Sequence, residues 1–249
     1  MDRTRRQMLF GVPLVGAGLL VAACRQPQSG SGGASNQKEK SEDESAQEAA
    51  AVPATEDLMR EHGILRRALL VYKESATRLK QDITSVPLDA LEKAAQLFRV
   101  FGEDYHERKL EETYIFPSLK RTQNPAAVYA DVLTAQHARG REITDYLLAI
   151  TAQDKIPTTS GNDFVNTLES FVRMYEHHSA VEDTLVFPAW RAAISTGEFD
   201  ELGARFEEIE EEQFGEDGFE AASRRMAEIE ESLGLSDLSI FTAPPPGRR

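Results

Sequence analysis

Two stretches of the sequence carry the same order of side chains, and these side chains could hold a metal ion. Residues 104–119 read DYHERKLEETYIFPSL, and residues 174–190 read MYEHHSAVEDTLVFPAW. In each stretch an aromatic residue and a histidine precede an acidic pair, which is followed by two apolar residues and Phe-Pro. Imidazole and carboxylate together suit iron, manganese or zinc. The repeated order therefore points to metal ligation.

Four of the five histidines stand where an amphipathic helix would place a core leucine, namely His62, His106, His137 and His178. Around them apolar residues recur at alternating steps of four and three, which is typical of a helix with one buried face. A helix rises about 1.5 Å per residue, so antiparallel neighbours bring these histidines within one or two turns of one level. We therefore expect the four imidazoles to meet in the core.

Carboxylates accompany two of these histidines. Glu182 follows His178 by four residues, which is one turn along the same helix face, and Glu111 is the matching residue after His106. Two helices that each offer a histidine and a carboxylate, opposite two further histidine-bearing helices, form the architecture of a dinuclear metal site in a bundle. The sequence predicts such a site.

Helix breakers divide residues 55–192 into four helical segments. They are Ser85-Val86-Pro87, Asn124-Pro125 and the stretch 157–161, and no alternating strand pattern of any length occurs. We predict an all-α fold, an up-down-up-down four-helix bundle. Residues 193–249 predict an acidic helical extension that docks through residues such as Phe199 and Phe206 and ends in an irregular tail.

The first 54 residues predict export and anchoring. Residues 1–24 contain Arg5-Arg6, which resembles a twin-arginine signal, and end in Val-Ala-Ala-Cys, which resembles a bacterial lipobox. We expect a lipoprotein signal peptide whose cleavage leaves an acylated Cys24 in a lipid bilayer, on the periplasmic or extracellular face of the cell envelope. Residues 25–54 are mostly small and polar and predict a flexible linker.

Composition excludes some partners. Acidic residues outnumber basic ones 42 to 28, which gives a formal net charge of −14. We expect no nucleic-acid partner, because a phosphate backbone requires a basic face. The single cysteine rules out an internal disulfide. A protein partner is not predicted.

Together these motifs resemble the hemerythrin-like, HHE cation-binding proteins over about residues 55–190. The resemblance rests on Glu61-His62, Tyr105-His106, Glu111-Glu112, Phe116-Pro117, Gln136 through Arg141, Tyr175, His178, Glu182-Asp183-Thr184 and Phe187-Pro188. It implies a four-helix bundle with a non-haem di-iron centre that reacts with dioxygen. The implied iron ligands are His62, His106, His137 and His178, with Glu111 and Glu182 as bridging carboxylates.

Several residues near the implied ligands have less certain roles. Oxygen-carrying members of the family have a second histidine where this chain has Arg141, and a guanidinium does not ligate metals, so we expect Arg141 to pair with a carboxylate or lie outside. His177 lies about 100° around the helix from the ligand face, in an outer or surface position. Asp183 could orient a ligand. Gly140 leaves room for a small ligand or for close helix packing.

The spacing in the second helix departs from that in the fourth. His106 and Glu111 are five residues apart, which would turn the side chains away from each other on an ideal helix. A π-bulge near Arg108 would absorb the extra residue. Glu107 or Glu112 are therefore alternative ligands on this helix.

Three functions follow from these observations. The first is a membrane-tethered di-iron protein that binds or senses dioxygen, nitric oxide or iron, with two iron ions favoured over manganese or zinc. The second is a di-iron oxidoreductase that reduces oxygen or peroxide with an external electron donor. The third is a structural bundle with a degenerate site, and the use of four histidines at one level argues against it. We favour the first, with a binding role ahead of an enzymatic one.

Overall fold

The computed structural model describes residues 52–247, and this part of the chain is helical with no strand. In chain order the elements are α1 (Ala54–Gln81), α2 (Leu88–Leu97), η1 (Phe98–Ile115), α3 (Phe116–Lys120), η2 (Pro125–Val128), α4 (Tyr129–Thr151), α5 (Gly161–Val181), η3 (Glu182–Val186), α6 (Phe187–Ala193), α7 (Thr196–Phe214), α8 (Gly218–Ser232) and η4 (Leu238–Phe241). Elements η1 and η3 are π-helical, whereas η2 and η4 are 3₁₀-helical. The expected all-α fold is confirmed.

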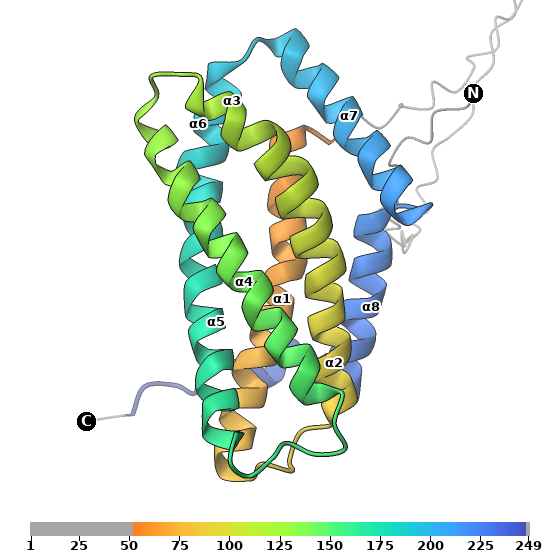
Figure 1. Cartoon of the computed structure of the whole chain (residues 1–249). Coiled ribbons are helices and arrows are strands. Elements are labelled where there is room, and N and C mark those ends of the chain that lie inside the picture. Colours follow the sequence, from red (N-terminus) through yellow and green to blue (C-terminus); the bar gives the residue numbers. More distant parts are fainter. Residues whose placement is uncertain (1–51, 248–249) are drawn as a thin grey trace, which may run out of the picture. The chain divides into compact units, whose positions relative to one another are not determined.

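Four rods form the bundle (Figure 1). The first is α1, the second is α2 continued by η1 and α3, the third is α4, and the fourth is α5 continued by η3 and α6. α1 packs against η1 and α5, and α4 packs against the same two elements, so the four rods enclose one core. This is the predicted up-down-up-down arrangement.

Aromatic side chains fill the core on one side of the histidine level. Phe98 lies between Phe171 and Tyr175, with both ring centroids 4.9 Å from its own and both contacts edge-on. Tyr72 meets Phe171 edge-on at 5.7 Å. Such pairs add to the free energy gained by burying apolar area, and they hold α1, η1 and α5 at fixed distances beside the histidines.

The C-terminal extension forms two helices, α7 and α8, that pack on the outside of the bundle against α1 and its neighbours. Phe206 of α7 stacks on the fully buried Trp190, with the ring centroids 6.1 Å apart. The side chain of Ser195 caps the start of α7, and Asp217 caps the start of α8. Gly215 ends α7 with φ of 66°, a conformation that glycine adopts without steric cost.

The outer surface differs from the sequence pattern at one apolar position. In a regular α-helix Leu185, three residues after Glu182, would continue the buried face, but this side chain is 44% exposed and Val186 is buried instead. The reason is that η3 is π-helical, which shifts the buried face by one residue after Glu182.

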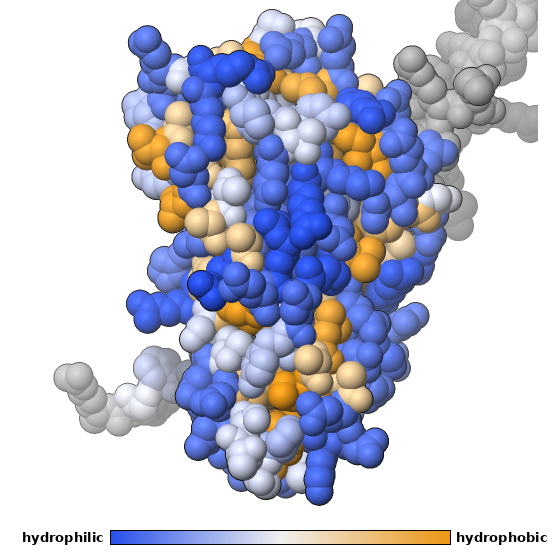
Figure 2. All heavy atoms as spheres, in the orientation of Figure 1, coloured by the Kyte–Doolittle hydropathy of each residue, from blue (hydrophilic) through white to orange (hydrophobic). Residues whose placement is uncertain are grey.

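The face of the molecule in Figure 2 is mainly hydrophilic, with small separate apolar patches.

The expected signal peptide (1–24), its lipidation residue Cys24 and nearly all of the expected linker (25–54) lie outside the described residues. Helix α1 begins at Ala54, at the end of the expected linker. Among the helices that the structure describes, none combines the length and the apolar character needed to cross a membrane.

Candidate metal centre

Two pairs of histidines face each other in the middle of the bundle. The Nε2 atoms of His62 on α1 and His106 on η1 are 3.0 Å apart, and so are those of His137 on α4 and His178 on α5. All four rings are at most 3% exposed. The structure thus brings together the four histidines that the sequence placed at one level.

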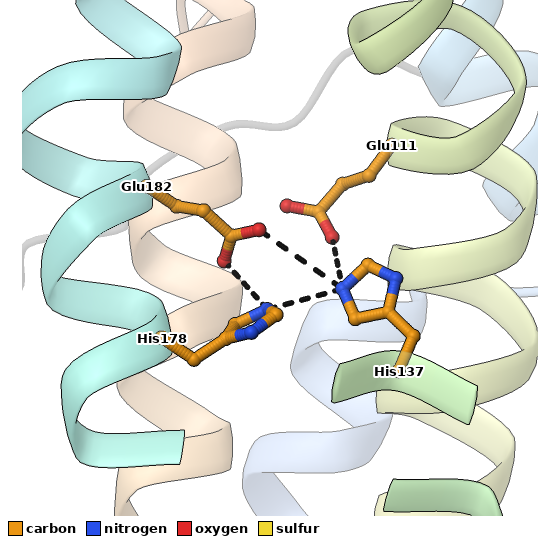
Figure 3. Close-up of side chains that lie close together, drawn as sticks. All are labelled: Glu111, His137, His178 and Glu182. Carbon is orange, nitrogen blue, oxygen red and sulfur yellow. Dashed lines mark hydrogen bonds and ion pairs between the residues drawn. The ribbon is translucent and has the colours of Figure 1, made fainter. Parts of the chain in front are cut away.

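Two buried glutamates lie close to these histidines, and Figure 3 shows them with His137 and His178. Glu111 reaches both pairs with different oxygens, since Oε1 is 3.3 Å from His106 Nε2 and Oε2 is 3.3 Å from His137 Nε2. Oε2 of Glu182 lies 3.0 Å from His178 Nε2 and 3.4 Å from His62 Nε2. Each carboxylate therefore reaches one histidine of each pair.

The donor set fits a cation better than it fits a protein core. Two nitrogens that each lie about 2.1 Å from one ion can be at most about 4.2 Å apart, and both histidine pairs meet this condition at 3.0 Å. The Glu111 and Glu182 carboxylates have all four oxygens buried, and none makes a hydrogen bond with the described part of the chain. Buried acceptors without donors are costly, whereas a metal ion would satisfy all of them.

Each histidine is held from behind by what we call an outer acceptor, a side-chain oxygen that accepts a hydrogen bond from Nδ1–H. The pairs are Asp183 with His62 at 2.7 Å, Glu61 with His106 at 2.6 Å, Glu112 with His137 at 2.9 Å and Gln136 with His178 at 2.9 Å. In a neutral ring with its proton on Nδ1, Nε2 presents a lone pair to the centre, which is the form that binds metal.

The outer acceptors link the four rods in a closed ring. Every outer acceptor is adjacent in sequence to a candidate ligand on its own rod, and it holds a histidine on the next rod. The outer acceptor on α1 holds the histidine on η1, the one on η1 holds the histidine on α4, and the one on α4 holds the histidine on α5. The outer acceptor on η3, in the fourth rod, holds the histidine on α1. We call this arrangement the acceptor ring.

Sequence comparison agrees with this geometry. A family model described as the hemerythrin HHE cation binding domain matches residues 54–190. The chain belongs to this family. Uncharacterized proteins of Mycobacterium tuberculosis and Mycobacterium bovis are each 45% identical to it over 192 residues, which is 77% of this chain and 74% of each relative. No solved structure matches the chain.

In this HHE domain the π-helical geometry of η1 reconciles the five-residue spacing with a shared face. Backbone bonds in a π-helix run between residues five apart, so His106 and Glu111 lie one above the other. The expected π-bulge extends over the whole of η1, from Phe98 to Ile115. Glu111, and neither of the alternatives Glu107 and Glu112, therefore reaches the histidine nitrogens of both pairs.

The two alternative ligands belong to a polar group beside the centre. Arg141 Nη1 donates to Glu112 Oε1 at 2.9 Å and lies 3.3 Å from Glu107 Oε2. The Tyr175 hydroxyl donates to Glu107 Oε1 at 2.7 Å. A Cβ added at Gly140 would lie 2.0 Å from the Tyr175 hydroxyl oxygen. Gly140 thus serves close packing, since it makes room for this phenol.

A small cavity adjoins the centre on the side of α1 and α5. Its volume of about 10 Å³ is roughly that of one water-sized molecule. Candidate ligands and polar neighbours both line it, among them His62, His106, Glu111, His178, Glu107 and Tyr175. A water-sized molecule in this cavity would lie beside candidate metal ligands and beside Tyr175.

The metal-free centre attracts protons. Burial alone would lower the pKa of His137, but the carboxylates of Glu107, Glu111 and Glu112 outweigh it and raise that pKa to about 10. Burial also acts to lower the pKa values of His62 and His106. Neighbouring carboxylates outweigh this effect, so both pKa values are raised as well. These carboxylates supply charge that either protons or a cation can balance.

The remaining sequence candidates lie outside the centre, and some contributors were not predicted. His177 is exposed and contacts the Arg173 carbonyl oxygen through Nδ1, whereas Asp183 orients His62. The roles of Glu61 and Gln136 as outer acceptors were missed. Their signal was adjacency, because each directly precedes a candidate histidine.

Proposed function

We propose that this HHE domain is a non-haem di-iron protein that binds or senses a small ligand such as dioxygen or nitric oxide, or iron itself. One observation carries the proposal, namely that four imidazole nitrogens and four hydrogen-bond-free carboxylate oxygens face one buried space. His62, His106, His137 and His178 would ligate the ions, and Glu111 and Glu182 would bridge them. Iron would supply the ability to bind a diatomic molecule reversibly.

The chain's own residues prepare the site for that role. The outer acceptors hold each imidazole with its lone pair inward. Arg141 binds carboxylates and contributes no ligand, which leaves fewer protein donors at the His137 position than oxygen-carrying relatives have. The small cavity excludes large molecules. Together these features favour small ligands at an incompletely filled coordination shell.

Metal analysis of the full-length protein tests the proposal. About two irons per chain are expected in protein from iron-replete cells. His178→Ala should abolish metal uptake, because it removes one donor and leaves Glu182 without its nearest nitrogen. His177→Ala is the matched control, since the exposed neighbour makes no contact with the centre. Equal metal loss in the two variants, or wild-type protein without metal, would refute the assignment.

Binding and catalysis give different results on the loaded protein. A visible absorption band that disappears on deoxygenation and returns on re-aeration favours a ligand-binding role. An oxidoreductase is the second candidate, because the phenol of Tyr175 and the carboxylate of Glu107 line the cavity and could exchange protons with a ligand. Sustained consumption of oxygen or peroxide with an added reductant would favour that candidate.

Membrane tethering forms part of the proposal and rests on the N-terminal sequence alone. The lipobox-like Val-Ala-Ala-Cys and the twin arginines support an exported protein anchored through Cys24. Metabolic labelling with a radioactive fatty acid should label the wild-type protein and leave Cys24→Ala unlabelled. Label retained in Cys24→Ala would contradict the anchor.

A further inference from the structure

Glu103 is a fully buried carboxylate that the metal centre does not use. It lies on η1, three residues before His106 and eight before Glu111, and its exposed fraction is 0%. With Glu107 and Glu111 it forms a series of three buried carboxylates at four-residue steps along one rod. A carboxylate so far from solvent is costly unless it is fully paired or protonated.

The partners of Glu103 satisfy only part of it. Thr144 on α4 donates its hydroxyl to Oε1 at 2.5 Å. Oε2 lies 3.0 Å from Arg99 Nη1, but the geometry is that of an ion pair without a hydrogen bond, so Oε2 has no donor within the described residues. An oxygen with no donor is a place where a proton can bind.

Arg99 connects this oxygen to the surface. Its guanidinium is partly exposed and also binds the carboxylate of Asp145, which is 73% exposed, as well as the carbonyl oxygen of Arg141 at 3.0 Å. Arg99 thus contacts both the buried Oε2 and a carboxylate at the surface. The other groups that face Glu103 come from every rod: Tyr72 on α1, Glu107 on η1, Arg141 on α4 and Tyr175 on α5.

Electrostatic contact links Glu103 to the candidate metal centre. Glu107 stands one step nearer the centre, where Arg141 bridges it to Glu112, the outer acceptor of His137. Charges inside a bundle are poorly screened, so negative charge added at the centre raises the proton affinity of a nearby carboxylate.

We propose that Glu103 is a proton-exchange site coupled to the metal centre, taking a proton from bulk water at Oε2 when the centre gains an electron and returning it when the electron leaves. The inference rests on the proposed function. An external one-electron donor supplies the electron, an O–H bond forms at Glu103, and no other bond in the chain forms or breaks. The net charge of the core is therefore unchanged by reduction.

The acidity of the group agrees with this role. Burial raises the pKa of Glu103, and the charge of Glu107 raises it further. Thr144, Arg99 and Arg141 lower it, and the resulting pKa is about 7. The group is thus divided between its two forms at neutral pH, where a small change in local charge moves the most protons.

The test compares Glu103→Gln with wild type, both as full-length, iron-loaded protein. The glutamine keeps the bond from Thr144 and cannot ionise. Each protein is reduced stepwise with dithionite in weak buffer, and protons taken up per electron are measured with a pH indicator between pH 5.5 and 8.5. Wild type should take up as much as one proton more than the variant, with equal metal content. The neighbouring Asp104→Asn, which removes an outward carboxylate, should behave as wild type.

A second measurement needs no redox change. In zinc-loaded protein the infrared carbonyl band of a protonated carboxylic acid should appear as the pH falls through about 7 and should be missing from Glu103→Gln. Thr144→Val removes a bond to the charged form, so the transition should move to higher pH.

Equal proton uptake in wild type and Glu103→Gln, a missing infrared band, or loss of metal from the variant would each overturn the proposal. Failure of the wild-type chain to take up metal would instead refute the proposed function, and the metal content measured first separates the two results.

Discussion

The phenol of Tyr175 shows how tightly individual residues are fitted beside the metal centre. Its hydroxyl reaches Glu107 only because position 140 lacks a Cβ, and its ring lies 5.2 Å from the ring of His178. Glycine inside a helix costs about 1 kcal/mol relative to alanine. Gly140 therefore lowers the stability of its helix, but it lets the Tyr175 hydroxyl lie beside the small cavity.

Gly140→Ala should destabilise the protein by about 1–3 kcal/mol, because the new methyl group would overlap the Tyr175 hydroxyl oxygen. Urea unfolding measures the change. Gly63→Ala on α1 is the control, since nothing lies within 4 Å of a Cβ there, and it should stabilise slightly. In a Tyr175→Phe background the penalty should shrink. A neutral or stabilising Gly140→Ala would show that Tyr175 moves away freely.

At the residue level, the sequence predicted which histidines converge, because periodicity decides which side of a helix is buried. It did not predict the outer acceptors. Glu61 and Gln136 act on histidines of a neighbouring rod, and helix periodicity carries no information about which rod is adjacent or at what height. The same holds for Glu103, which only tertiary packing distinguishes from the exposed glutamates of the chain.

At the level of elements, two π-helical segments and two outer helices distinguish this protein from a bundle of four regular α-helices. The five-residue spacing after His106 predicted a local bulge, whereas η1 is π-helical along its full length. A similar turn at η3 was not predicted, since the four-residue spacing there already fits an α-helix, and this π-helical turn leaves Leu185 exposed. Such rods persist when tertiary contacts compensate for poorer backbone geometry.

The extension carried by α7 and α8 should contribute to the stability of the whole domain. Phe206 is 5% exposed and stacks on Trp190. Phe206→Ala should lower the free energy of unfolding by about 3–5 kcal/mol, the usual cost of emptying a buried aromatic site. Phe241→Ala, at a position 45% exposed, is the control and should change little. If Phe206→Ala were equally mild, the extension would be separable from the bundle.

At the level of the whole molecule, metal and protons compete for the same nitrogens. The pKa values of His62, His106 and His137 are raised in the folded, metal-free protein. Metal binding must displace those protons, so affinity should fall by about tenfold per pH unit for each proton displaced. Titration with zinc should release protons at both pH 6 and pH 8, and binding should be tighter at pH 8. Binding independent of pH would show that the nitrogens are already free.

The stability of the metal-free chain should change in the opposite direction. A histidine whose folded pKa is raised stabilises the fold fully below its unfolded value of about 6.5, and that contribution disappears as the pH rises through the folded value, about 10 for His137. The unfolding free energy without metal should therefore decline between about pH 6.5 and pH 10. Chemical denaturation in the presence of a chelator checks the slope, and a rising curve would contradict it.

Metal should also stabilise the whole chain by mass action. A ligand that binds only the folded state at 100 times its Kd adds about 2.7 kcal/mol. The thermal midpoint of the loaded protein should fall after chelation and recover when metal is returned. Glu111→Gln should show a smaller difference between the two states, because the variant lacks one of the two central carboxylates.

The acceptor ring has a consequence for how the molecule is assembled. Each rod both gives one Nδ1 contact and receives one, so a rod that is late or displaced leaves two imidazoles unsupported, its own and that of the next rod. Partial occupancy by a cation is then disfavoured, and capture of metal becomes an all-or-none event that reports completed folding.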